Sequence, residues 1–240
     1  MTANASTLGV KIFADGADKQ KITELAALPV VKGFTTNPSL MKQAGVKDYE
    51  AFAREILPIV NGRSISFEVF ADEFQEMERQ ALKIAAWGDN VYVKIPVTNT
   101  KGETTTPLIR RLVARRVKLN VTAIFTSRQI REVVDALAGA TAGYVSVFAG
   151  RIADAGIDPM PAMREAVELC NSAGKGLEVI WASPRELLNI VQANSIGCHI
   201  ITVTPDMLKK LSTLGKDLGE FSLDTVKTFY KDGLAAGYKL

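Results

Sequence analysis

The chain has 240 residues, of which 47% are hydrophobic and 23% are charged, and its formal net charge is +3. This length accommodates either two small domains or one α/β barrel. The small net charge gives no indication of a nucleic-acid partner. No apolar run reaches the length of a membrane span, and the first residues lack the basic start and apolar core of a signal peptide. We therefore expect a cytoplasmic protein with neither a nucleic-acid nor a membrane partner.

The histidine and cysteine content excludes several kinds of site. His199 is the only histidine, so metal sites built from several histidines are excluded, and a Ser-His-Asp triad would have to use this residue. Within the apolar run Cys-His-Ile-Ile it is more typical of a packed, hydrogen-bonded residue. Cys170 and Cys198 are too few and too far apart to indicate a disulfide framework or a zinc site, which fits a reducing compartment.

Strand and helix signals alternate along the whole chain. In the first half, the expected strands are residues 8–14, 30–35, 64–70 and 91–95, and the expected helices are residues 19–28, 48–60, 73–87 and 105–116. In the second half, the strands are residues 118–125, 143–148, 177–182 and 199–203, and the helices are residues 127–138, 160–173, 184–193 and 205–214. A last amphipathic segment, about residues 223–236, closes the chain.

Eight strands that alternate with eight helices predict the α/β class and, within it, one parallel (β/α)8 or TIM barrel. The chain contains no Pro/Gly/Ser-rich linker, so we expect residues 1–240 to form a single barrel domain with a C-terminal helical segment at about 220–240. Doubly wound sheets also alternate strands and helices. However, no glycine-rich phosphate turn follows the first expected strand, which favours the barrel.

Lys94 lies at the carboxyl end of a mostly apolar strand. The stretch reads Val-Tyr-Val-Lys-Ile-Pro, and Pro96 ends the strand because proline cannot donate to a sheet ladder. An ammonium group is costly to bury, and burial favours the neutral amine, which can form a Schiff base with a carbonyl. The alternative is a lysine that reaches solvent or forms a structural ion pair.

The alternation of side chains along a strand assigns each residue to one of two faces. In the fourth strand, Tyr92 and Lys94 are expected to point into the barrel; in the fifth, Ala123 is expected to face the helices. The polar residues that the same rule gathers near the carboxyl ends of six successive strands are Asp15, Asn37, Glu68, Lys94, Asn120 with Thr122, and Ser146. Each has a structural alternative, such as a helix cap or a turn. Together they predict a site, because so many buried polar groups without a ligand would be costly, and barrel enzymes carry their chemistry at this end.

One lysine and two carboxylates, with hydroxyl and amide groups around them, suit Schiff-base chemistry on a keto sugar. The protonated imine acts as an electron sink while a carbon-carbon bond breaks, and a carboxylate accepts the hydroxyl proton. Hydride transfer would need a nucleotide-binding motif, and metal-dependent aldol cleavage would need more metal ligands. We therefore expect an enzyme that uses neither a cofactor nor a metal.

Six motifs follow one another along the chain. They are Phe13-Ala-Asp15, Thr35-Thr-Asn-Pro-Ser39, Val93-Lys-Ile-Pro-Val-Thr98, Asn120-Val-Thr122, Ser146-Val-Phe-Ala-Gly-Arg-Ile152 and Ala182-Ser-Pro-Arg185. In this order they resemble the motifs of the transaldolase family, a class I, Schiff-base family, and especially its short subfamily that includes the fructose-6-phosphate aldolases. The resemblance covers nearly the whole chain, and its most specific pieces are Thr-Thr-Asn-Pro and the strand with Lys-Ile-Pro.

The resemblance implies a role for each candidate residue. Lys94 would form the Schiff base, and Asp15 would be the acid-base group for carbon-carbon cleavage. Glu68 and Thr122 would hold the water that moves protons while the imine forms. The residues implied to bind hydroxyls of the dihydroxyacetone unit are Asn37, Asn120 and Ser146, and those implied to hold the sugar phosphate are Arg151, Ser183 and Arg185.

Two positions bear on the reaction that the resemblance implies. The family's transaldolases carry glutamate and phenylalanine where its fructose-6-phosphate aldolases carry glutamine and tyrosine, and this chain has Glu68 and Phe148. This favours transfer of dihydroxyacetone from fructose 6-phosphate or sedoheptulose 7-phosphate to an aldose phosphate, as in the pentose phosphate pathway. Pro184 stands where the family usually has phenylalanine, which leaves donor and acceptor preference open, and with it a role in specialised sugar biosynthesis.

Two other functions stay open at this point. One is an aldolase that releases free dihydroxyacetone, and the other is a non-catalytic phosphosugar-binding barrel, in which Lys94 would form no adduct. Family members of this short type assemble as pentameric rings or decamers, partly through the C-terminal helix. The resemblance therefore implies a homo-oligomer whose partners are sugar phosphate substrates and further copies of the chain.

Overall fold

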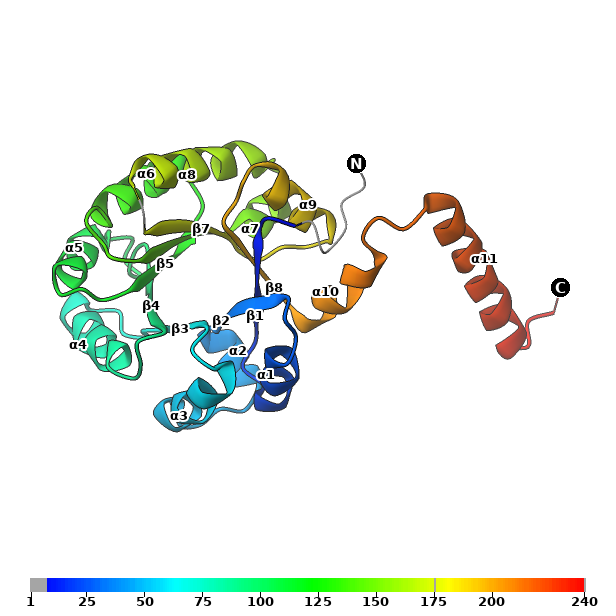
Figure 1. Cartoon of the computed structure of the whole chain (residues 1–240), viewed down its shortest axis with the longest axis horizontal. Coiled ribbons are helices and arrows are strands. Elements are labelled where there is room, and N and C mark those ends of the chain that lie inside the picture. Colours follow the sequence, from blue (N-terminus) through cyan, green and yellow to red (C-terminus); the bar gives the residue numbers. More distant parts are fainter. Residues whose placement is uncertain (1–7, 175, 240) are drawn as a thin grey trace.

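A computed structural model describes residues 8–174 and 176–239, so the first seven residues, in which the sequence indicates no signal peptide, lie outside it. Within the described residues, eight parallel strands form a closed barrel in sequence order, with β8 paired to β1 (Figure 1). The strands are β1 (Lys11–Asp15), β2 (Val31–Thr35), β3 (Ser64–Glu68), β4 (Val91–Pro96), β5 (Leu119–Ile124), β6 (Gly143–Val147), β7 (Leu177–Trp181) and β8 (Ile200–Val203). The predicted TIM barrel is confirmed.

Helices connect the strands and surround the barrel, and further helices follow β8 (Figure 1). They are α1 (Lys19–Ala26), α2 (Pro38–Gln43), α3 (Tyr49–Val60), α4 (Phe74–Ala85), α5 (Thr106–Ala114), α6 (Ser127–Ala136), α7 (Ala149–Asp154), α8 (Met160–Ser172), α9 (Leu188–Ser195), α10 (Pro205–Lys209), the 3-10 helix η2 (Lys210–Thr213) and α11 (Leu218–Ala235). The Asp18 side chain caps α1 by accepting the backbone N–H of Lys21.

The short helices α2 and α7 were absent from the prediction. Each has six residues, too few for an apolar period of 3.6 to show in the sequence. In α2, Asn37 and Pro38 are the N-cap and the first residue of the helix. Both helices directly follow a strand at the carboxyl end of the barrel, so they shape the site described below.

The expected helix at 184–193 begins later, at Leu188. The backbone N–H groups of Arg185 and Glu186 donate to the Asn189 side chain, which holds this stretch as a loop. The expected helix at 205–214 divides into α10 and η2, and the last helix begins at Leu218, earlier than predicted, because Asp217 caps it.

The barrel interior contains a small apolar cluster. It consists of Phe13, Tyr144, Ile180, Ala182 and Ile200, with Tyr92 and Phe148 packed against it. The Tyr92 and Tyr144 rings stack with centroids 4.0 Å apart. Gly33 is needed beside this cluster, because a Cβ there would lie 2.5 Å from the Phe13 ring. The inward orientation of Tyr92 and the burial of Val91, Val93 and Ile95 in the outer core follow the predicted alternation in β4.

The alternation fails at one place in β5. The β5–β6 register shifts between Val121 and Ile124, and Ala123 has a left-handed backbone with φ of 59°. Ala123 therefore lines the cavity at the carboxyl end, and the prediction that it faces the helices was wrong. A non-glycine residue with positive φ is strained, and such strain is found most often near functional sites.

Helix α11 stands clear of the barrel in Figure 1, drawn in orange-red at the end of the chain. None of its residues is buried. The large apolar side chains that it and its flanking residues expose are Leu218, Phe221, Leu223, Val226, Phe229, Tyr230, Leu234 and Tyr238. That residues 220–240 belong to the barrel domain therefore stays a prediction. Among the described residues, no helix is long and apolar enough to cross a membrane.

Candidate active site

A cavity of about 440 Å³ opens at the carboxyl end of the barrel. Ten of the eleven predicted site residues line it, namely Asp15, Asn37, Glu68, Lys94, Asn120, Thr122, Ser146, Phe148, Arg151 and Ser183. Residues from seven strands or the loops after them thus meet in one place, because the strands are parallel and their carboxyl ends share one edge. The eleventh residue, Arg185, lies outside this lining.

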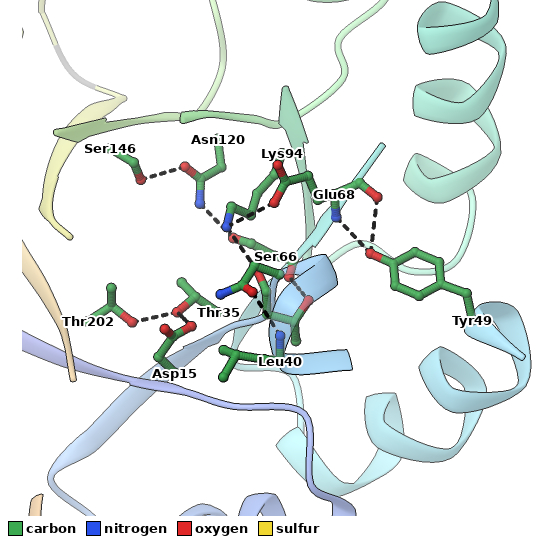
Figure 2. Close-up of polar contacts among 12 residues, drawn as sticks. Asp15, Thr35, Leu40, Tyr49, Ser66, Glu68, Lys94, Asn120, Ser146 and Thr202 are labelled. Carbon is green, nitrogen blue, oxygen red and sulfur yellow. Dashed lines mark hydrogen bonds and ion pairs between the residues drawn. The ribbon is translucent and has the colours of Figure 1, made fainter. Parts of the chain in front are cut away.

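Lys94 projects from β4 into this cavity and is buried, with 7% of its surface exposed. Its Nζ donates a hydrogen bond of 2.9 Å to the backbone carbonyl of Thr36 and lies 3.4 Å from Oε2 of Glu68 (Figure 2). The amine is thus held by one neutral acceptor and one carboxylate. The carboxylate is close enough to receive a proton when the amine has to become a nucleophile.

Asp15 is the last residue of β1, and it also lines the cavity. Its Oδ1 accepts a hydrogen bond of 2.7 Å from the Thr35 hydroxyl, which also contacts the Thr202 hydroxyl (Figure 2). Burial raises the pKa of Asp15, and this effect outweighs the lowering by the positive charge of Lys94 and by the Thr35 hydrogen bond. A carboxyl group whose pKa is raised exchanges a proton more readily near neutral pH than an ordinary aspartate does.

A chain of hydrogen-bonded polar side chains links β6, β5 and β3. Ser146 donates to Oδ1 of Asn120 over 2.7 Å, and the Asn120 amide donates to the Ser66 hydroxyl over 2.9 Å. All three residues are buried. Since each uses a neighbour as partner, their orientations are fixed before any ligand binds.

Thr122 differs from this chain, because its buried hydroxyl has no hydrogen-bond partner among the described residues. The positive φ of the next residue, Ala123, turns the strand here, so both Thr122 and Ala123 face the cavity. An unpaired buried hydroxyl costs free energy unless a water or a ligand meets it. Thr122 therefore offers an unpaired hydroxyl to a polar group that enters the cavity.

The other side of the cavity carries Phe148, Arg151 and Ser183. The guanidinium carbon of Arg151 lies 5.2 Å from the centre of the Phe148 ring. Gly150, in the same helix α7, has to be glycine, because a Cβ there would lie 1.5 Å from the Ser183 carbonyl oxygen. Close packing of α7 on the loop after β7 thus brings Arg151 and Ser183 together, where an anion would meet a positive charge.

Arg185 is engaged elsewhere. Its guanidinium makes a forked ion pair with Asp154, the last residue of α7, with the Nε donor 2.8 Å from Oδ1. This pair lowers the pKa of Asp154 and involves two side chains that are each about half exposed, at 45% and 52%. To bind a phosphate, Arg185 would have to leave Asp154 or share it.

Asn37 both caps helix α2 and lines the cavity. Its side-chain oxygen caps α2 by accepting the Leu40 N–H over 2.9 Å, so that its NH₂ group is the part left to donate to a ligand.

His199 lies far from this group of residues, next to the amino end of β8. Its Nδ1 accepts the Val179 N–H over 3.1 Å, as a packed residue would.

Several contributors were missed from the sequence. Thr202 would have been found by extending the alternation rule to β8, since it lines the cavity from the inward face. Thr36 contributes only its carbonyl, and Tyr49 reaches β3 from helix α3 to bond the backbone of Glu68 (Figure 2). No pattern in the sequence indicates either contact.

Fold and site together define a class of protein. It is a (β/α)8 barrel that gathers a buried lysine, two carboxyl groups and a set of hydroxyl and amide groups at the carboxyl end of its strands.

Comparison with known proteins gives the family. The family model described as transaldolase/fructose-6-phosphate aldolase matches residues 12–236. A probable transaldolase of Methanococcus maripaludis is 37% identical over 202 residues, covering 84% of this chain and 89% of that protein. A probable transaldolase of Streptococcus equi subsp. zooepidemicus is 36% identical over 225 residues, covering 93% of this chain and 97% of that protein. The chain belongs to the transaldolase/fructose-6-phosphate aldolase family, as its motifs indicate.

Solved structures share the fold. A putative phosphonomutase from Burkholderia cenocepacia gives a TM-score of 0.58 at 12% identity, covering 94% of this chain and 96% of that one. Dihydrodipicolinate synthase from Rhodopseudomonas palustris gives 0.54 at 15% identity, covering 98% and 83%. At these identities the likeness concerns the barrel alone.

Proposed function

We propose that the protein is a transaldolase, which moves a dihydroxyacetone unit from a ketose phosphate to an aldose phosphate through a Schiff base on Lys94. One observation carries the proposal. The Lys94 amine is buried at the carboxyl end of β4, in a cavity that also holds Glu68 and Asp15. A buried amine beside a carboxylate acceptor is suited to attack a carbonyl carbon.

In the first half of the reaction, the Lys94 amine adds to the keto carbon of the donor sugar. The carbinolamine then loses water to become a protonated imine. Glu68, 3.4 Å from Nζ, accepts and returns the protons through a water that also meets the unpaired Thr122 hydroxyl. This assigns a use to the buried hydroxyl that no neighbouring side chain satisfies.

In the second half, Asp15 takes the proton from the hydroxyl next to the bond that breaks. The electron pair of that bond moves to the imine nitrogen, which leaves an enamine on Lys94 and releases an aldose phosphate. The enamine then attacks the aldehyde of the acceptor, Asp15 returns the proton, and hydrolysis frees the lysine. The raised pKa of Asp15 suits a group that has to take and give a proton in one cycle.

The remaining cavity residues bind the sugar in this proposal. The fixed chain of Asn120 and Ser146, with the NH₂ group of Asn37, meets the hydroxyls of the dihydroxyacetone unit. Arg151 and Ser183 hold the phosphate, and Arg185 joins them by leaving Asp154. The donor substrate in this proposal is fructose 6-phosphate or sedoheptulose 7-phosphate. The reaction takes place in the cytoplasm, as a step of the pentose phosphate pathway.

The deciding test is borohydride trapping with fructose 6-phosphate, followed by intact mass and peptide mapping. The expected result is a dihydroxyacetone-derived adduct on Lys94 that erythrose 4-phosphate discharges when it is added before the reductant. Lys94→Ala is the control that should give no adduct. If the adduct forms but is discharged only as free dihydroxyacetone, the protein is an aldolase. If no keto sugar phosphate gives an adduct, Schiff-base chemistry is excluded and a phosphosugar-binding barrel remains.

We also propose that the protein is a homo-oligomer, a pentamer or a decamer, assembled in part through α11. The support is the set of apolar side chains on α11 that stay exposed among the described residues. Large exposed apolar surfaces usually mark contacts with other chains. Light scattering at micromolar concentration should give a multiple of 26.0 kDa. A mass equal to one chain would contradict the proposal.

A further inference from the structure

The hydrogen-bond ladder between β2 and β3 opens beside Lys94. The Thr36 N–H donates to the Ser66 carbonyl over 3.2 Å. In a parallel ladder, the next bond would run from the Glu68 N–H to the Thr36 carbonyl. Within the described residues this bond is not made, and the Thr36 carbonyl instead accepts Nζ of Lys94 over 2.9 Å. On the other side of β3 the ladder continues, since the Val69 N–H donates to the Lys94 carbonyl over 3.1 Å.

The free Glu68 N–H is taken by a side chain from outside the sheet. The Tyr49 hydroxyl, at the start of α3, accepts the Glu68 N–H over 2.8 Å and donates to the Glu68 carbonyl over 3.1 Å (Figure 2). One phenol group thus satisfies both backbone groups of this residue. Burial strongly raises the pKa of Tyr49, so the hydroxyl keeps the proton that it donates.

Aromatic neighbours fix the position of that hydroxyl. The Tyr49 ring packs edge to face against Phe67, Phe70 and Trp87, with centroids 5.9, 4.7 and 5.6 Å away. Tyr49 does not line the main cavity, so it cannot touch a substrate there. Its effect on the site passes through the backbone of Glu68 and the carbonyl of Thr36.

We propose that Tyr49 is a positioning residue: by taking the Glu68 N–H out of the β2–β3 ladder, it keeps the Thr36 carbonyl free to hold the Lys94 amine. Without the phenol hydroxyl, the Glu68 N–H turns to the Thr36 carbonyl and competes with Nζ. Lys94 then pairs mainly with the Glu68 carboxylate, so that Nζ is no longer held by the Thr36 carbonyl and is less well placed to attack a carbonyl carbon. The consequence for catalysis rests on the Lys94 Schiff base proposed above. The exchange of hydrogen-bond partners at the Thr36 carbonyl does not depend on it.

The test compares Tyr49→Phe with wild type and with Tyr144→Phe. The control also removes a buried phenol hydroxyl bonded to β3, but at the other end of that strand, where Tyr144 donates to the Ser64 hydroxyl over 3.0 Å. Nucleophilicity of Lys94 is measured without turnover, as the rate of acetylation by acetic anhydride at neutral pH, followed by peptide mass spectrometry. Exposed lysines in the same digest serve as internal standards.

Tyr49→Phe should slow acetylation of Lys94 by about tenfold, the factor that corresponds to one hydrogen bond to a charged group, while Tyr144→Phe and the exposed lysines react as in wild type. In turnover, kcat should fall by a similar factor with KM for the aldose phosphate unchanged. Equal acetylation rates for Lys94 in all three proteins overturn the inference, even if wild type forms the sugar adduct. A slowed rate supports it even if no sugar adduct forms, so the two proposals fail separately.

A second measurement decides the question if Tyr49→Phe does not fold. In a crystal structure of the unliganded wild type, the Glu68 nitrogen should lie within hydrogen-bond distance of the Tyr49 hydroxyl and beyond it from the Thr36 oxygen. A Glu68 to Thr36 hydrogen bond in that structure would overturn the proposal.

Discussion

Replacing Asp15 by asparagine should stabilise the protein at neutral pH while removing most of its activity. Asparagine keeps an oxygen that can accept the Thr35 hydroxyl but carries no charge. The largest effect on the pKa of Asp15 is burial, which raises it, and the attraction to Lys94 only partly offsets this. The ionised carboxylate is therefore a net cost to folding at pH 7, and the substitution removes that cost.

The sign of the pH dependence follows from the same shift. Unfolded Asp15 loses its proton near its ordinary pKa of 3.8, whereas the folded protein holds the proton to higher pH. In that interval the folded state binds more protons, so the stability of wild type falls as pH rises from about 3.8 through the raised pKa and is then constant. The stabilisation by Asp15→Asn should therefore be present at pH 7 and shrink as pH approaches 4.

We expect a gain of about 1 kcal/mol at pH 7, a common size for a stabilising substitution, which corresponds to a rise in Tm of about 2 to 4 °C for a chain of this length. Thermal unfolding followed by circular dichroism at pH 7 and pH 4.5 measures it. Activity should fall by about 10² to 10⁴-fold because a general acid-base group is lost. Borohydride should still trap a ketose adduct on Lys94, since imine formation does not require Asp15.

Asp154→Asn is the matched control. Asp154 is exposed and its pKa is lowered by the hydrogen bond from Arg185, so its loss should not raise Tm at pH 7. If Asp15→Asn leaves Tm unchanged or lowers it at pH 7, or raises it equally at both pH values, burial of the charge is not the cost inferred here.

Three further predictions concern the cavity and its frame. Phe148→Tyr should increase release of free dihydroxyacetone from fructose 6-phosphate relative to transfer, measured with a coupled dehydrogenase; no gain would count against the transferase assignment of that position. Thr122→Val removes an unpaired buried hydroxyl, so Tm should stay the same or rise. Trapping of the imine should slow at least tenfold, which is roughly the contribution of one hydrogen bond to a charged group. A large loss of Tm would show that the hydroxyl has a structural partner. Gly150→Ala should lower Tm by about 6 to 12 °C, a cost of about 3 kcal/mol, because the new Cβ would lie 1.5 Å from the Ser183 oxygen. Gly233→Ala in exposed α11, where a Cβ meets no atom within 4 Å, is its control, and equal Tm losses in the two variants would refute the packing argument.

The amino-acid sequence by itself determined the barrel and most of the cavity. Strands and helices alternate with clear breaks, and in a closed parallel barrel every strand delivers its carboxyl end to the same face. Two-residue alternation therefore sufficed to bring Asp15, Glu68, Lys94 and Ser146 together from strands far apart in the chain. The roles of these residues in a reaction remain predictions, because their chemistry depends on substrates that only an assay supplies.

Tertiary structure alone decided the contacts that depart from regular geometry. The left-handed backbone at Ala123 breaks the alternation in β5, and the forked pair with Asp154 holds Arg185 outside the cavity lining. Tyr49, on helix α3, takes the place of one hydrogen bond between β2 and β3. The alternation rule applies to strands and gives no information about this contact. Local patterns report which face a residue occupies, because that depends on the chain's own repeat. They cannot report which distant atom meets a given backbone group, because that depends on how separate elements pack.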